Sequence, residues 1–231
     1  MRNLITLGGG GFSMEETDSP LDRYMLEQTG KPHPRVCFLP TASGDAEGYI
    51  AKFHARLKKL GAETYHLTVF RQEVEDFREF ILSMDAVYIG GGSTHNMLLL
   101  WKAWGLDLIL MDAYERGVMM FGLSAGANCW FEQSVTDSWA SGLRGMPGLS
   151  VLAGSFCPHF DSEPERRPLF VTAISSGELL PGYGVDDFCG LHFQEGKLLR
   201  CIASRDNASA VYYSPHHDDI SEVPLEVVLL E

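Results

Sequence analysis

The chain has 231 residues, 45% of them hydrophobic, and a formal net charge of −13 at pH 7. This length and composition predict a folded protein with one substantial core and exclude a disordered or fibrous chain. The acidic balance, with no lysine or arginine run longer than a pair, argues against a nucleic-acid binder, and no apolar stretch reaches the roughly 18–20 residues of a membrane helix.

The cysteines and the first residues indicate the compartment. The apolar run at residues 4–7 is too short for a signal-peptide core and leads directly into glycines. The cysteines are odd in number and none forms a CxxC pair, so we expect no metal site and reduced thiols in a cytoplasmic protein. They are Cys37, Cys129, Cys157, Cys189 and Cys201.

Residues 1–123 alternate between short apolar runs and amphipathic stretches. Apolar runs that stop at turn residues are typical of buried parallel strands, and recurrence at three- and four-residue steps is typical of helices. The order predicts an open, mostly parallel α/β sheet, whose ligand sites lie beyond the carboxyl ends of the strands. The expected strands are 4–7, 36–39, 64–69, 86–89 and 118–123, and the expected helices are 50–60, 76–84, 96–104 and 106–116.

The second half contains four more strand candidates, at 186–193, 197–203, 210–214 and 223–230. Turn signals such as Gly196-Lys197 and Asp206-Asn207 separate them. We expect added antiparallel strands on the same sheet. Because no linker or repeat divides the chain, residues 1–231 are expected to form a single domain.

The strongest chemical signal is Gly122-Leu123-Ser124-Ala125-Gly126, directly after an apolar run. A G-x-S-x-G pattern between a strand and a helix forces the serine into a sharp, exposed turn, and the flanking glycines avoid a Cβ clash. The N–H groups and dipole of the following helix would favour an oxyanion at Ser124. The alternative is a tight turn that happens to hold a serine.

A serine nucleophile needs a base, and His159 is the best-placed of the histidines. It lies in Cys157-Pro158-His159-Phe160, where a proline ends an apolar run. His95 is a candidate for lining the site. His192 lies in an apolar run and is read as structural, while His33, His54 and His66 are read as ordinary surface or core residues. His216-His217 beside Asp218-Asp219 resembles a solvated turn, with a metal site as the alternative.

Two glycine runs follow predicted strands. Residues 90–92 precede Ser93-Thr94, and their backbone N–H groups can approach a ligand closely. No phosphate-binding G-x-x-x-x-G-K-[ST] pattern is present. Residues 8–11 do not match a dinucleotide fingerprint, because Met14 occupies the position of its last glycine, so this run is read as a tight turn.

Three motifs together resemble the peptidase E family: Ile-Gly-Gly-Gly-Ser-Thr at 89–94, Gly-Leu-Ser-Ala-Gly-Ala-Asn at 122–128 and Cys-Pro-His-Phe at 157–160. The resemblance spans about residues 1–213. It implies serine dipeptidases related to cyanophycinase, on a flavodoxin-like, class I glutamine-amidotransferase-like fold. Ser124 would be the nucleophile and His159 the base, with an oxyanion hole from the N–H of Gly91 or Gly92 and that of Ala125.

The resemblance also implies a third, orienting acid between the serine and the histidine, and Asp137 is our choice. Glu132 competes, although it is expected on the helix after Ser124, and a Ser–His dyad remains an alternative. Cleavage after an N-terminal aspartate is implied as well. Recognition of that side chain needs a cation, which Arg166 or Arg167 could supply if they are not merely the first turn of a surface helix.

The resulting expectation is a serine exopeptidase that hydrolyses short peptides through an acyl-enzyme, with no metal or organic cofactor. Serine at the elbow, where amidotransferases have cysteine, argues against glutamine amide transfer. The alternatives are a cyanophycinase-like or isoaspartyl peptidase and a non-catalytic amidotransferase-like binding protein. The expected partner is a small peptide. The apolar cluster of Trp101, Trp104 and residues 98–100 is read as core, with a homodimer face as the alternative.

Overall fold

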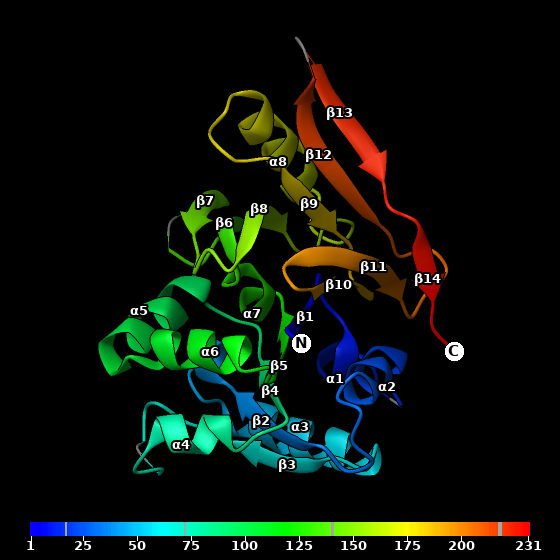
Figure 1. Cartoon of the computed structure of the whole chain (residues 1–231). Coiled ribbons are helices and arrows are strands. Elements are labelled where there is room, and N and C mark those ends of the chain that lie inside the picture. Colours follow the sequence, from blue (N-terminus) through cyan, green and yellow to red (C-terminus); the bar gives the residue numbers. More distant parts are fainter. Residues whose placement is uncertain (17, 72, 140, 217–218) are drawn as a thin grey trace.

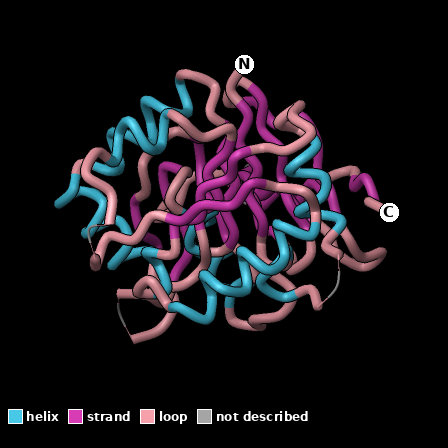
Figure 2. Tube along the Cα trace, turned by 90° about the horizontal axis from the view of Figure 1, so that it is seen from below, coloured by secondary structure: helices cyan, strands magenta, loops and turns pink. Residues whose placement is uncertain are grey.

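The computed structural model describes residues 1–16, 18–71, 73–139, 141–216 and 219–231. Its strands form two sheets, one of eight strands and one of six. Helices lie around the outside of the strands (Figures 1 and 2). The predicted fold class, a mostly parallel α/β sheet flanked by helices with antiparallel strands added from the C-terminal part, is confirmed. His217 and Asp218 of the suggested metal turn lie outside the described residues.

The eight-stranded sheet contains all five strands expected in the first half of the chain. They are β1 (Asn3–Leu7), β2 (Arg35–Leu39), β3 (Glu63–His66), β4 (Ala86–Ile89) and β5 (Met119–Leu123). They pair in parallel in the order β1-β5-β4-β2-β3. The carboxyl ends of β1, β5 and β4 are therefore neighbours, so the two glycine runs and Ser124 meet at one edge of the sheet.

Alternate residues of these strands face two separate cores. One core joins Leu39, Val87 and Ile89 to the helices α4 (Phe77–Leu82), α5 (Thr94–Trp104) and α6 (Leu106–Glu115). The other joins Phe38 and Tyr88 to α2 (Pro20–Glu27) and α3 (Glu47–Lys59). This period of two is what a strand buried on both faces requires, and it explains why the runs read as continuously apolar.

The helix boundaries follow local signals. Ser93 caps α5 by accepting a hydrogen bond from the Asn96 N–H, and Asp76 caps α4 by accepting one from the Glu79 N–H. Gly61 and Gly117 follow α3 and α6 with φ of +89°, a conformation that favours glycine. Neither α2 nor the four-residue α1 (Gly11–Met14) was expected from the sequence.

The C-terminal strands divide between the two sheets, which corrects the expectation that all of them extend the first one. The strands β10 (Cys189–Gln194), β11 (Lys197–Ala203) and β14 (Val227–Leu229) continue the eight-stranded sheet beyond β1. The strands β12 (Ala210–His216) and β13 (Asp219–Pro224) form a long hairpin on the other sheet (Figure 1). Apolar alternation identifies a strand but carries no information about its partner, which is why the sequence reading failed here.

The six-stranded sheet also contains four strands that the sequence analysis did not identify as strands. They are β6 (Phe131–Thr136), β7 (Arg144–Pro147), β8 (Leu152–Cys157) and β9 (Gly182–Val185), in the order β13-β12-β9-β8-β6-β7. The helix α8 (Arg166–Ser175) packs on β12 and β13. Residues of both sheets share one core, in which Phe131 and Phe156 stack 4.8 Å apart and Phe131 contacts Phe193.

The apolar cluster on α5 is divided. Trp101 and Leu98 are buried in the core, and the Trp101 indole donates a hydrogen bond to Thr41. Leu99 and Trp104 are 55% and 42% exposed. The core reading therefore holds for part of the cluster, and a homodimer through the exposed part stays a prediction. Within the described residues, no helix is long and apolar enough to cross a membrane.

Candidate active site

Ser124 occupies a sharp turn between β5 and the short helix α7 (Ala125–Asn128). Its φ of +50° is unusual for a residue other than glycine, and such strain is often found at functional sites. Its N–H donates to the Leu7 carbonyl, and its carbonyl accepts the N–H groups of Ala127 and Asn128. These bonds fix the turn and leave the Ser124 side chain partly exposed.

The two glycines of the elbow are required by close backbone contacts. A Cβ on Gly122 would lie 2.1 Å from the Gly126 oxygen, and one on Gly126 would lie 2.2 Å from the Ile89 oxygen. The local structure thus matches the predicted elbow. The helix after it is shorter than expected: α7 has four residues and β6 begins at Phe131, so the helix dipole at Ser124 is small.

His159 reaches Ser124 from the second sheet. It follows β8 and Pro158, where the proline ends the strand, and its φ is +52°. Its Nε2 lies 2.9 Å from the Ser124 Oγ, and its Nδ1 lies 2.6 Å from the Asp187 Oδ1. Serine, histidine and carboxylate are therefore connected in the order that proton transfer from the serine requires.

The carboxylate beside His159 is Asp187, and this corrects the choice of Asp137. Asp187 lies in the turn between β9 and β10, close to the carboxyl end of β1. Asp137 follows β6, is exposed and lines a pocket with Ser162 and Glu163 instead. The competing Glu132 is on β6 rather than on the elbow helix, and its carboxylate accepts the Gly154 N–H at 2.7 Å.

Other groups hold Asp187 in place and charged. Its N–H donates to the Asp161 Oδ1 at 2.8 Å. Burial alone would raise the pKa of Asp187, but hydrogen bonds from His159 and Ser162 and the charge of Arg166 outweigh it, and the pKa is lowered. Asp187 is thus an anion at neutral pH, able to accept the Nδ1–H of His159.

The first glycine run, residues 8–11, packs against His159 and Asp187. A Cβ on Gly9 would lie 2.0 Å from the Asp187 Oδ1 and 3.0 Å from the His159 Cε1, and one on Gly8 would lie 2.3 Å from the Asp186 oxygen. The absence of side chains here lets Asp187 and His159 pack directly on the backbone after β1. The run is a tight turn, as expected, but its glycines are also needed for the position of the site residues.

The second glycine run lies beside the serine. A Cβ on Gly91 would lie 3.5 Å from the Ser124 Cβ. Gly92 has φ of +134°, and a Cβ there would lie 2.2 Å from the Ala42 oxygen. The Gly91 N–H donates to the Tyr49 hydroxyl at a long 3.4 Å. Gly91 thus lies beside Ser124 after β4, and Ala125 follows the serine directly in α7; their roles as oxyanion donors stay predictions.

The two arginines proposed to bind substrate already have protein partners. The Arg166 guanidinium is buried and donates from Nε to Glu163 at 2.7 Å and from Nη1 to the Val135 carbonyl at 3.1 Å. Arg167 is exposed and donates to Glu222 at 2.8 Å. Both lie at the start of α8, so the surface-helix reading describes their backbone correctly.

Five other histidines lie outside the Ser124–His159–Asp187 chain of hydrogen bonds. His95, in the first turn of α5, stacks on Trp139 and lines an apolar pocket of about 300 Å³ with it. His192 is buried on β10 between the Tyr24 hydroxyl and Asn3, and burial together with nearby Arg200 lowers its pKa to about 4. His54 and His66 hydrogen bond to each other, and His33 bonds to the Gly61 carbonyl.

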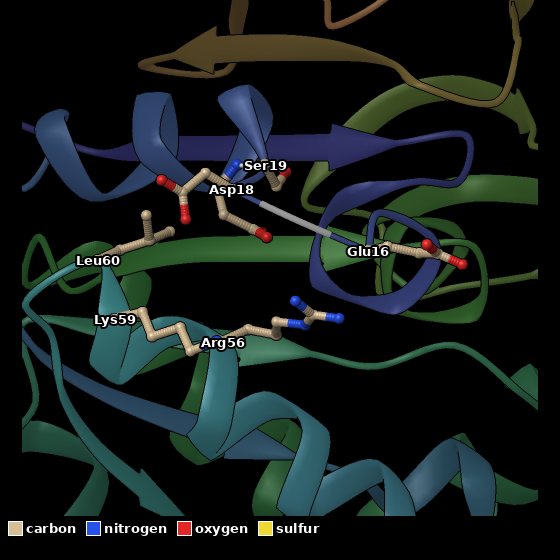
Figure 3. Close-up of a pocket in the computed structure, with 7 residues that line it drawn as sticks. Glu16, Asp18, Ser19, Arg56, Lys59 and Leu60 are labelled. Atoms are coloured by element: carbon tan, nitrogen blue, oxygen red, sulfur yellow. Dashed lines mark hydrogen bonds between the residues drawn. The ribbon is translucent and has the colours of Figure 1, made fainter.

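A further pocket lies between the start of α2 and the C-terminal end of α3 (Figure 3). Its volume is about 390 Å³, and its charged side chains are of both signs. None of the residues that line it belongs to the Ser124–His159–Asp187 chain. They are Glu16, Asp18, Ser19, Asp22, Arg56, Lys59 and Leu60.

The sequence contained one usable signal for Asp187 that we did not use. Asp186-Asp187 stands between two apolar segments, and a carboxylate in that position must have partners. Asp186 accepts the N–H and the hydroxyl of Ser209. Asp187 has His159 as its partner. The resemblance implied the chain order serine, acid, histidine, whereas Asp187 follows His159 in the chain; this order differs between folds that share such a constellation.

The site joins a strained serine at a tight turn, a histidine and a buried carboxylate, a set of groups that can transfer acyl groups. Comparison with known proteins shows the class of enzyme. The chain belongs to peptidase family S51, whose model matches residues 4–201. The protein is therefore a peptidase.

Individual relatives span all or most of the chain. It is 46% identical over 230 residues to the uncharacterized peptidase YgaJ of Bacillus subtilis, with 100% of both chains covered. It is 23% identical over 222 residues to peptidase E of Pasteurella multocida, covering 89% of this chain and 91% of the relative.

Two solved structures share the fold. A peptidase from an acI-B1 Actinobacterium superimposes with a TM-score of 0.69 at 16% identity, covering 96% of this chain and 95% of its own. A putative peptidase E protein from Listeria monocytogenes superimposes with a TM-score of 0.61 at 17% identity, covering 98% and 100%. The resemblance to peptidase E inferred from three motifs is thus confirmed.

Proposed function

We propose that the protein is a serine-type exopeptidase, similar to peptidase E, that hydrolyses short peptides in the cytoplasm. The observation that carries this proposal is the chain of hydrogen-bond contacts from the Ser124 Oγ to the His159 Nε2 and from its Nδ1 to Asp187. Five free, buried cysteines agree with a reducing compartment. Cell fractionation with an antibody to the chain tests the location, and recovery outside the cytoplasm would refute it.

In the acylation step, His159 takes the Ser124 proton at Nε2 while Oγ attacks the peptide carbonyl carbon. The N–H of Ala125 and that of Gly91 or Gly92 stabilise the oxyanion, which develops beside the serine. His159 then gives the proton to the leaving amine, and the C–N bond breaks. Asp187 accepts the Nδ1–H throughout, which fixes the imidazole tautomer and stabilises the imidazolium.

In the deacylation step, a water molecule gives one proton to His159 and attacks the ester carbon. The same N–H donors hold the second oxyanion, and the Ser124 Oγ leaves with the proton returned by His159. The products are the free acid and the free amine. Each proposed step uses only side chains and backbone groups of this chain, with no metal or organic cofactor.

The test is hydrolysis of a dipeptide panel, X-Leu with X varied, including α- and β-linked Asp-Leu. Wild type is compared with Ser124→Ala, in which we expect a loss of several orders of magnitude in rate. A fluorophosphonate should label Ser124 covalently in the wild type. Unchanged hydrolysis in the variant would refute the proposal. Cleavage of the β-linked peptide alone would select an isoaspartyl or cyanophycinase-like activity. Absence of both cleavage and labelling would point to a protein that binds peptides without turnover.

A further inference from the structure

The segment after His159 lines a pocket that includes Ser162, a residue that interacts with Asp187. The pocket has a volume of about 470 Å³, and we call it the Glu163 pocket; it is lined by Asp137, Gly142, Leu143, Ser162, Glu163, Pro164 and Glu165. The Glu163 N–H donates to the His159 carbonyl at 3.1 Å, and Ser162 interacts with Asp187. These two contacts connect the pocket to His159 and Asp187, and on this ground we take it as a subsite for a side chain next to the bond cleaved at Ser124.

The charge that this pocket presents is negative. Asp137, Glu163 and Glu165 line it, and none of the described residues that line it is cationic. Arg166, one of the two arginines considered from the sequence as the cation for an acidic substrate, is not among them. Its side chain is 5% exposed, while that of Glu163 is 46% exposed. The guanidinium therefore lies behind the carboxylate, and a substrate entering the pocket meets Glu163 first.

The two further contacts of this segment fix the arrangement. The Arg166 Nη1 donates to the Val135 carbonyl, which holds the guanidinium against β6 rather than towards the pocket. The Arg166 N–H also donates to the Glu163 carbonyl, so both residues belong to one turn at the start of α8. Arg167, the other cation here, is paired with Glu222 of β13. The local geometry thus supplies a neutralised arginine and an accessible carboxylate.

We propose that Glu163 determines specificity: by pairing with Arg166 and lining the pocket, it makes the enzyme reject acidic side chains next to the cleaved bond. This inference rests on the proposed peptidase function and names the substrate class, peptides with neutral or cationic residues at that position. A substrate carboxylate there would face like charges in a partly desolvated pocket and would find no free cation. Removing the Glu163 charge would leave Arg166 unneutralised one side chain away.

The experiment uses pairs of substrates that differ in charge and hardly in shape. They are Asp-Leu with Asn-Leu, and Ala-Asp with Ala-Asn. The first pair varies the charge of the residue before the cleaved bond, and the second varies the charge of the residue after it. The measured quantity is the ratio of kcat/KM for the amide to kcat/KM for the acid. In the wild type we expect a ratio of about ten or more for at least one pair. Raising the salt concentration from 0.05 to 0.5 M should lower that ratio, because screening weakens the repulsion.

The variant is Glu163→Gln, whose Oε1 can still accept the Arg166 Nε–H, so the turn should keep its shape. We expect its ratio to fall about tenfold. The matched control is Glu165→Gln, which removes the same charge from the same pocket two residues away, where no pairing with Arg166 is lost. Its ratio should change less than threefold. An equal change in both variants would overturn the inference, and so would a wild type that prefers the acids.

Labelling by a fluorophosphonate separates this inference from the proposed function. Glu163→Gln labelled at the wild-type rate has an intact Ser124 and His159, so its ratio can be read directly. If the variant does not fold, the salt dependence of the wild-type ratio decides, and a ratio that ignores salt overturns the inference. If the wild type is neither labelled nor active on any peptide, the proposed function fails, and the inference fails with it for that separate reason.

Discussion

Ser124 and His159 both stand at the end of a strand with a positive φ, +50° and +52°, yet the two sides of the site are built differently. The turn at Ser124 is set by glycines two residues away on each side, and its contacts come from neighbouring parallel strands. The position of His159 depends on Asp187, 28 residues further along the chain. The nucleophile side is thus a local structure, whereas the base side exists only once the second sheet has formed.

The largest expected effect on activity comes from a substitution on the base side alone. Asp187→Asn removes the charge that stabilises the imidazolium and offers His159 an amide that can impose the wrong tautomer. We expect kcat/KM on the best dipeptide to fall about 10³–10⁴-fold. The far-UV circular dichroism spectrum should match that of the wild type, which shows that the variant is folded. Asp137→Asn is the control and should stay within about threefold of wild type. A large loss in Asp137→Asn and none in Asp187→Asn would restore the acid expected from sequence.

A smaller loss of activity should follow from a substitution in the glycine run at residues 8–11, on which Asp187 and His159 pack. In Gly9→Ala the new methyl group would meet the Asp187 Oδ1 and the His159 Cε1, so the pair must shift. Misplacement of catalytic groups by about 1 Å can cost about 100-fold in rate, and we expect a fall of about 10–100-fold in kcat. Gly48→Ala on α3, where a Cβ meets nothing within 4 Å, is the control. Equal activity of the two variants would show that a glycine at position 9 is not needed to place Asp187 and His159.

The same contrast explains what the sequence could reveal. The strands of the first sheet are continuous apolar runs that end at turn residues, and the elbow, the glycine runs and His159 are all defined by near neighbours. The strands and the turn at Ser124 have the predicted form, while the catalytic roles of Ser124 and His159 stay predictions. The strand β6 was not identified, because Phe131–Thr136 follows the elbow so closely that it was taken as a continuation of its helix.

Asp187 and the division of the C-terminal strands were missed for a related reason. A carboxylate acquires its role from whichever group the fold brings to it, and nothing within a few residues of Asp187 indicates a histidine. Likewise, the alternation in residues 210–214 predicts a strand but not its pairing with β9 in the second sheet. The pairing of Arg166 with Glu163 could have been anticipated, because the two are three residues apart at a helix start.

The nucleophile side has its own buried carboxylate, that of Asp22. Removing its charge should raise the free energy of unfolding modestly, whereas most substitutions in a core lower it. Burial first, and the charge of Glu15 next, raise the pKa of Asp22 to about 7. Its Oδ1 accepts the Tyr88 hydroxyl, and within the described residues its Oδ2 has no hydrogen-bond partner. Because the folded pKa exceeds the unfolded one, the native state binds more protons between about pH 4 and 7, and stability falls as pH rises through this window.

Asp22→Asn should therefore stabilise the protein at pH 8 by about 1–2 kcal/mol and change little at pH 4. Urea unfolding at both pH values measures this. The control is Asp18→Asn, whose carboxylate is 64% exposed and should change stability by less than about 0.5 kcal/mol at either pH. Destabilisation of Asp22→Asn at pH 8 would mean that the ionised carboxylate has a stabilising partner within the fold.

The smallest expected effect concerns Arg167, on the outer face of the base side. Its pair with Glu222 joins side chains that are 56% and 43% exposed, and such pairs contribute between 0 and about 1 kcal/mol. Arg167→Ala should therefore change the free energy of unfolding by less than about 1 kcal/mol and the amide-to-acid ratio by less than twofold. A loss of tenfold or more confined to acidic substrates would instead identify Arg167 as the cation expected from sequence. Arg167 would then contribute to the recognition of substrate charge, and Glu163 could not be the sole determinant of specificity.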